Sequence, residues 1–214
     1  MSDTREIYLS PLLAAPWVPP RRLRRPMDAD GTETAMLDAL ALGDRDAALR
    51  LLMRAYGPAV YRYCRQMVGA GDLADEAHQM TFVKAYEGLA RFARRSTLRT
   101  WLLGIAHHRC LDVLKMSRRR EKRFPLTAEP PERPSPALTA EEDLTGRSRV
   151  QALGACLREL APHIRAAVLL RFQQGATYEE MSVLEGERPA TLQARVVRAL
   201  PVLRRCLERK GATP

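Results

Sequence analysis

The residues best suited to chemistry gather between positions 91 and 124, in the stretch RFARRSTLRTWLLGIAHHRCLDVLKMSRRREKRF. Its first part joins an aromatic ring to cations and a hydroxyl: Phe92, Arg94, Arg95, Ser96 and Arg99. Aromatic rings stack on unpaired bases and guanidinium groups neutralise phosphates, so this mixture is typical of a surface for single-stranded nucleic acid. The alternative is that Phe92 and Trp101 are core residues. For Trp101, at helical spacing between Leu98 and Ile105, the core is the better interpretation.

The same stretch continues as a cationic helix. Its apolar spacing ends near Lys115, and the positions that follow carry Arg118, Arg119, Arg120, Lys122 and Arg123. A helix that extends beyond its own core with this charge suits a phosphate backbone.

A second pattern, between positions 177 and 203, predicts a helix-turn-helix. The letters TYEE at Thr177–Glu180 form a capping box, Gly186 supplies the turn, and Pro189 begins the second helix. That helix would turn Gln193, Ala194, Val197 and Arg198 outward. Arg198 suits guanine and Gln193 suits adenine, whereas Arg188 and Arg195 suit phosphates. The alternative is a helical hairpin with a solvated charged face.

Other reactive residues do not form a catalytic or metal-binding set. Among His107, His108 and Cys110, only the first and last share a helix face, and no fourth ligand accompanies them. Asp75 and Glu76 have no nucleophile or glycine-rich loop near them in the sequence. We therefore expect no enzyme activity, no metal and no cofactor. The four cysteines are widely separated and are expected to be free thiols in a reducing compartment.

Composition narrows the class of partner. The chain has 214 residues, a net charge of +10 and 46% hydrophobic residues, so it can form a packed core while attracting polyanions such as nucleic acid. We expect a cytoplasmic protein, because the N-terminus does not read as a signal peptide, and no apolar run is long enough to insert in a membrane.

The apolar periodicity is helical throughout, which predicts an all-α protein with two small helical domains joined by a flexible linker. We expect a disordered, Arg-rich arm over 1–32, unless translation begins at Met27. The first domain covers 33–123, the proline-rich linker 124–146 and the second domain 147–210. Within these domains, Gly57-Pro58 is expected to interrupt a helix, and Pro201 to kink the last one.

The sequence resembles a bacterial RNA polymerase sigma factor of the extracytoplasmic-function (ECF) group. LRLLMRAYGPAVYRYCRQMVGAGDLADEAHQMTFVKAYEGLARF and STLRTWLLGIAHHRCLDVLKMSRRR are similar to sigma region two, and LRELAPHIRAAVLLRFQQGATYEEMSVLEGERPATLQARVVRAL is similar to region four. The resemblance covers roughly residues 45–120 and 150–207. The two motifs in this order are more specific than either alone.

The resemblance implies promoter recognition, DNA melting and transcription initiation. Core RNA polymerase would contact the residues Asp75, Glu76, Gln79, Met80 and Lys84 through its clamp. The unpaired minus-ten bases would contact a larger set: Phe92, Arg94, Arg95, Ser96, Arg99, His107, His108, Lys115, Arg118, Arg119 and Arg120. Region four would bind the duplex at the minus-thirty-five element through Arg188, Gln193, Ala194, Arg195, Val197 and Arg198. An anti-sigma factor is a further implied partner.

The sequence departs from the family pattern at several of these positions. Met80 stands where an acid is frequent, His108 where Asn is usual, and Gln193 and Ala194 where a cation and a serine are usual. Glu185 and Glu187 occupy positions that are commonly apolar. These departures keep open a sigma-like decoy that does not open promoters. A further alternative is a helix-turn-helix regulator that works without polymerase.

Overall fold

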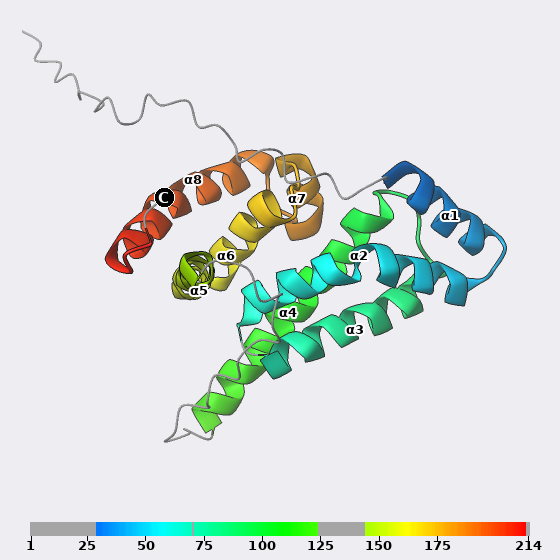
Figure 1. Cartoon of the computed structure of the whole chain (residues 1–214). Helices are drawn as coiled ribbons and strands as arrows, with labels where there is room; N and C mark the ends of the chain where they lie inside the picture. The colour runs from blue at the N-terminus through cyan, green and yellow to red at the C-terminus, as the bar shows by residue number, and fades with distance from the viewer. Residues whose placement is uncertain (1–28, 70, 124–143, 213–214) are drawn as a thin grey trace, which may run out of the picture.

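The computed structural model describes residues 29–69, 71–123 and 144–212, and these residues are helical with short connections (Figure 1). The prediction of an all-α fold is confirmed. Most of the predicted arm and linker lie outside the described residues. The first helix begins at Ala29 and the fifth at Leu144, so a few residues assigned from the sequence to the arm and the linker are helical.

Four helices form the first body: α1 (Ala29–Ala41), α2 (Arg45–Val68), α3 (Gly71–Leu89) and α4 (Leu98–Arg123). Helix α2 begins after Asp44, whose side chain accepts a hydrogen bond from the amide of Ala47 at 2.8 Å. This bond satisfies one of the amide groups left open at a helix start. The buried stripe of α2, which includes Leu52, Tyr56 and Tyr63, faces the other three helices.

Five segments form the second body: α5 (Leu144–Glu159), α6 (Pro162–Val168), the π-helical turn η2 (Leu169–Gln173), α7 (Tyr178–Glu185) and α8 (Pro189–Arg209). The predicted capping box is present, because Thr177 and Glu180 exchange side-chain hydrogen bonds with each other's amide. Gly186 ends α7 with a φ of 70°, a conformation that glycine adopts without the strain imposed on other residues.

Two helices continue through an internal proline. Helix α2 runs through Pro58, and α8 continues beyond Pro201 to Arg209, so the prediction of a break at Gly57-Pro58 was wrong. Each proline is exposed, and so is the residue four positions earlier, Arg54 or Val197, whose carbonyl lacks the usual amide donor. Water can solvate these carbonyls, while burial of the residues on both sides holds each helix together.

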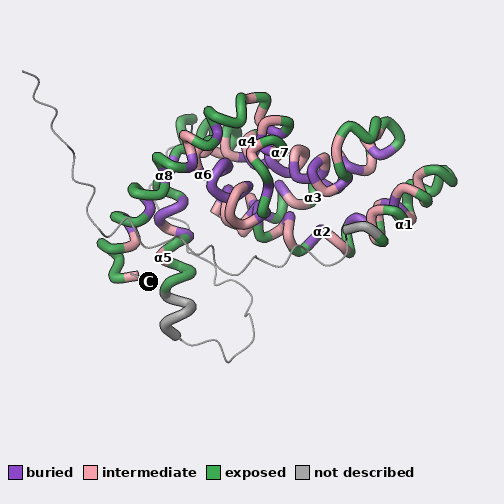
Figure 2. Tube along the Cα trace, turned by 90° about the horizontal axis from the view of Figure 1, so that it is seen from above, coloured by how far each residue is buried: buried purple, intermediate pink, exposed green. Residues whose placement is uncertain are grey.

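The two bodies pack against each other rather than standing apart. Helices α2 and α4 contact α5, α6, η2 and α7, and buried residues from both bodies form one apolar cluster (Figure 2). Arg165 and Arg99 donate hydrogen bonds across the boundary. The buried guanidinium of Arg165 donates to the backbone carbonyls of Leu157, Arg158, Leu160 and, in the first body, Met67. From the first body, Arg99 donates to the carbonyl of Gln174.

The cysteines do not all behave as expected. Cys156 in α5 and Cys206 in α8 form a disulfide across 50 positions of sequence, so the prediction that all four are free thiols was wrong. The two residues lie 50 positions apart in the sequence, and only the packing of α5 on α8 brings them together. Cys64 and Cys110 are free and buried.

Candidate nucleic-acid interface

The connection between α3 and α4 carries the aromatic and cationic residues singled out in the sequence. Phe92 and Trp101 pack together with ring centroids 5.3 Å apart, and both are partly buried. A Cβ atom at Gly88 would lie 2.8 Å from the Trp101 ring, so this glycine lets the indole lie against α3. Arg94 and Arg95 are exposed. The aromatic pair therefore anchors a connection that presents cations to solvent.

Two side chains fix the start of α4. Thr97 Oγ1 accepts from the amide of Thr100 at 3.1 Å and so satisfies one of the open amides at the helix start. Glu33 of α1 accepts from the amide of Leu98 at 2.7 Å. A carboxylate at the positive end of a helix dipole is favourable, and here it also ties α1 to the connection beside Ser96. Glu33 was not a predicted contact, because its partner lies 65 positions away in the sequence.

Helix α4 changes character along its length, as its sequence indicated. Its last buried residue is Val113, and Lys115, Arg118, Arg119 and Arg120 are all exposed. The end of α4 projects past the neighbouring helices in Figure 1. These cations lie on an extension of the bundle that a phosphate backbone can approach from solvent.

The two adjacent histidines of α4 have different surroundings. His108 is exposed, and its Nδ1 donates to the carbonyl of Gly104 at 2.7 Å. His107 is buried, with Nδ1 3.2 Å from the Tyr63 hydroxyl, and burial lowers its pKa to about 4. A neutral, buried imidazole does not face a DNA strand, so its placement argues against the minus-ten role expected for His107.

A groove of about 420 Å³ lies beside the contact between α4 and α7. Its walls combine apolar groups with cations and imidazole, and include Lys84, Trp101, Ile105, His108, Val183 and Leu184. Arg99 lies beside the boundary between the bodies, and its guanidinium donates a hydrogen bond to the carbonyl of Gln174. The structure thus brings the predicted surface for unpaired bases next to the helix-turn-helix.

Helix α8 carries the predicted base-reading residues on its open side. Arg188, Gln193, Val197 and Arg198 are exposed, and Ala194 is half-buried. Leu192 and Val196 are buried on the opposite side, as are Met181 and Leu184 of α7. The packing of the two helices therefore leaves a free face that combines amide, apolar and cationic groups.

Arg195, expected to hold a phosphate, lies between two acids. It contacts Glu185 at 2.8 Å and Glu187 at 2.5 Å, and its side chain is only 16% exposed. Burial raises the pKa of Glu185 to about 7 against the opposing effect of Arg195, whereas the hydrogen bond from Arg195 lowers the pKa of Glu187. The two acids that depart from the family pattern thus pair with Arg195 across the turn.

Helix α3 presents the residues expected to contact a protein partner. Asp75, Glu76, Gln79 and Met80 are exposed on the side opposite the buried Ala74, Ala77 and Thr81. Lys84 is half-buried and pairs with Glu87 at 2.7 Å.

Comparison with known proteins identifies the class. Residues 52–121 match the family model described as Sigma-70 region 2, which covers α3 and most of α2 and α4. The RNA polymerase sigma factor CarQ of Myxococcus xanthus is 30% identical over 165 residues, which cover 77% of this chain and 91% of that protein. The chain belongs to the RNA polymerase sigma factors, in the ECF group.

Further similarities extend over most of the chain. The ECF sigma factor SigC of Mycobacterium tuberculosis is 29% identical over 180 residues, which cover 83% of this chain and 94% of that protein. The sigma factor RpoE from Bartonella quintana, solved with the anti-sigma factor NepR, shares the fold with a TM-score of 0.63, 23% identity and coverage of 74% and 96%. CnrH, solved with the cytosolic domain of CnrY, has a TM-score of 0.61, 20% identity and coverage of 85% and 99%. No helix within the described ranges has the length and apolar character needed to cross a membrane.

Proposed function

We propose that this sigma factor recognises promoters through two surfaces, one on each body. The first comprises the connection before α4, with Phe92, Arg94, Arg95 and Ser96, together with His108 and the cationic end of α4. It would hold the unpaired minus-ten strand by stacking and charge. The second is the free face of α8, with Arg188, Gln193, Val197 and Arg198, which would enter the major groove of the minus-thirty-five duplex. The observation that carries the proposal is the exposure of Arg94, Arg95 and His108 on one body and of Arg188, Gln193, Val197 and Arg198 on the other, beside a buried helix-turn-helix core.

The exposed face of α3 would dock on the core polymerase through Asp75, Glu76, Gln79 and Met80. No bond needs to be made or broken by this protein. DNA melting would follow from binding energy that favours the open strand, because unpaired bases gain stacking contacts.

The contacts between the bodies imply that the protein changes shape when it works. Arg99 is bound to Gln174, and the Gln174 amide donates to the Ala59 carbonyl at 3.2 Å, so the surface for unpaired bases lies against the second body. Binding two separated promoter elements would require these contacts to open. An anti-sigma factor that prefers the closed arrangement would hold the protein inactive by shifting this equilibrium.

Run-off transcription with core RNA polymerase tests the proposal. Specific transcripts from a promoter selected by this protein are expected, with starts located by sequencing. Upstream DNA binding without core-dependent transcripts would instead support a free-standing regulator. Core binding without transcripts would support a decoy, an alternative kept open by Met80, His108, Gln193 and Ala194.

A further inference from the structure

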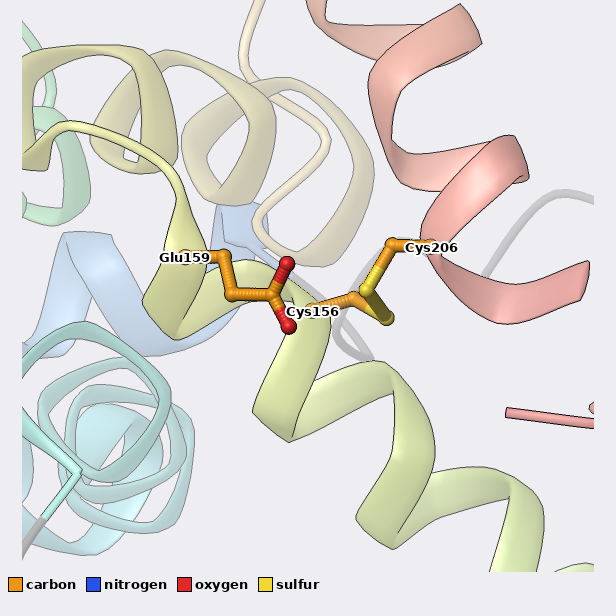
Figure 3. Close-up of side chains that lie close together, drawn as sticks. All are labelled: Cys156, Glu159 and Cys206. Carbon is orange, nitrogen blue, oxygen red and sulfur yellow. A yellow bond between two sulfur atoms is a disulfide. The ribbon is translucent and has the colours of Figure 1, made fainter. Parts of the chain in front are cut away.

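A cluster of three side chains lies away from both proposed DNA-binding surfaces. Cys156 of α5 and Cys206 of α8 form the disulfide, and their Cα atoms are 5.8 Å apart, within the usual range for such a bond. A carboxylate oxygen of Glu159 lies within 4.8 Å of both sulfur atoms (Figure 3). Arg209 and Lys210 pair with that carboxylate at 3.3 and 3.8 Å.

The disulfide connects the first and last helices of the second body. The bond closes a loop that contains α6, η2, α7 and most of α8, and so encloses the whole helix-turn-helix. Helix α5 also lies against the first body, where the Arg158 side chain approaches Gly69. The crosslink therefore fastens the second helix of the helix-turn-helix to the helix that follows the linker.

We propose that Cys156 and Cys206 form a reversible thiol–disulfide pair, a redox modification site whose oxidised form stabilises the DNA-binding body. In the reducing direction, a dithiol donates two electrons and two protons; the S–S bond breaks, two thiols form, and the dithiol becomes a disulfide. In the oxidising direction, one cysteine thiol gives up its proton and the thiolate attacks hydrogen peroxide; the O–O bond breaks, the cysteine becomes a sulfenic acid, and the hydroxide that leaves takes up the released proton to form water. The second thiol then displaces a second water as the S–S bond forms.

Both cysteines are buried, but each lies in the last turn of its helix. Helix ends open more readily than helix centres, and Glu159 beside the sulfur atoms is exposed. Local opening at these two ends would therefore admit a small dithiol or peroxide without unfolding the body.

The other two cysteines form a natural comparison within the same chain. Cys64 and Cys110 lie inside α2 and α4, both fully buried. A hydrogen bond to Cys64, together with burial, raises the pKa of the Cys110 thiol, which keeps it protonated and a poor nucleophile. Redox chemistry is thus expected at the pair in the second body and not at the pair in the first.

The test uses the full chain, purified without reductant. Free thiols are alkylated with one reagent in denaturant, and a second, isotopically distinct reagent is added after reduction. The first label is expected on Cys64 and Cys110 and the second on Cys156 and Cys206. The dithiol-reduced chain should melt on the order of 10 °C lower than the oxidised chain, because the bond restricts a long loop of the unfolded chain. First-label modification of all four cysteines would overturn the proposal, as would identical melting of the two forms.

Two double variants separate the pairs. Cys156→Ala/Cys206→Ala should melt at one temperature whether or not dithiol is present, whereas Cys64→Ala/Cys110→Ala should keep the difference between oxidised and reduced forms. If the first variant does not fold, the labelling and melting of the natural chain still decide. Only the consequence for DNA rests on the proposed function: between the two melting temperatures, the oxidised chain should bind an upstream duplex that the reduced chain has lost.

A metal site is the competing assignment for the same three side chains. Two thiolates and a carboxylate suit Zn²⁺ once the disulfide is reduced. Zn²⁺ is therefore added to the reduced chain and the bound metal is measured after dialysis. Retention of one equivalent, lost in Glu159→Gln, would replace the redox assignment. A reduced chain that retains no Zn²⁺, and a Glu159→Gln variant that still forms the disulfide, are the expected results.

Discussion

Arg99 donates a hydrogen bond from its guanidinium to the backbone carbonyl of Gln174, so a cation expected to meet an unpaired DNA strand is held by the other helical body. Arg165 makes the reciprocal contact, from the second body to the carbonyl of Met67. These two bonds tie the closed arrangement together. Both end on backbone carbonyls, which keep their hydrogen-bonding capacity when the bodies separate.

Arg165→Ala should lower the free energy of unfolding by about 2–4 kcal/mol, because four backbone carbonyls lose their buried donor. Urea unfolding of the full chain measures the change. Arg205→Ala, which removes an exposed arginine from α8, is the matched control and should change stability by less than about 0.5 kcal/mol. Equal effects of the two variants would show that the carbonyls near Arg165 find other donors.

Neutralising Arg118, Arg119 and Arg120 together should flatten the salt dependence of DNA binding. On duplex DNA, the slope of log affinity against log salt should fall by about 0.9 for each lost phosphate contact, and by about 0.7 on a single strand. Neutralising Arg50, Arg54 and Arg62, three exposed arginines of α2, removes the same charge elsewhere. A slope that changes equally in both triple variants would mean that net charge alone matters.

Arg198→Ala should weaken binding to the minus-thirty-five duplex by about 1–3 kcal/mol and relax the preference at one base pair. Binding to a panel of duplexes with single substitutions measures both effects. Arg205→Ala again serves as the control on the same helix. Uniform weakening across the panel would reassign Arg198 to a phosphate.

Glu185 should make stability fall as the pH rises. Because its pKa is raised to about 7 in the folded protein, its stabilising contribution is complete below about pH 4.5 and is lost through about pH 7. Glu185→Gln should therefore gain stability relative to the natural chain between pH 5 and 8, by about 2–3 kcal/mol. Urea unfolding at several pH values tests this, with the exposed Glu179→Gln as control. A pH-independent difference for Glu185→Gln would contradict the prediction.

His107 should make stability fall as the pH falls, which is the opposite of the effect of Glu185. Its pKa is lowered to about 4, so the stability that it contributes is present above about pH 6.5 and is lost as the pH falls towards 4. Over that interval the natural chain should lose about 3 kcal/mol of its free energy of unfolding through His107. The His107→Gln variant keeps a polar partner for Tyr63 and should not show this loss. The exposed His163→Gln should leave the acid sensitivity intact. Persistence of the full loss in His107→Gln would place the responsible group elsewhere.

Much of this protein could be predicted from its sequence, because many of its features depend on residues that are close together in the chain. The capping box at Thr177 and the turn at Gly186 depend on neighbours a few residues away, and both are present. The period of apolar residues predicted helices, and the loss of that period after Lys115 indicated where α4 would leave the core. Family membership was equally accessible, because two motifs occur in a fixed order.

Only the tertiary structure decided which residues of distant segments pair with each other. No local pattern indicates that Cys156 meets Cys206, that Glu33 caps α4, or that Arg99 is held by Gln174. Likewise, His107 and His108 are neighbours in sequence, yet one is buried and the other exposed, because a helix turns successive side chains to different sides. Sequence periodicity fixes which face of a helix is buried; only the packing of one helix on another determines which residues meet there.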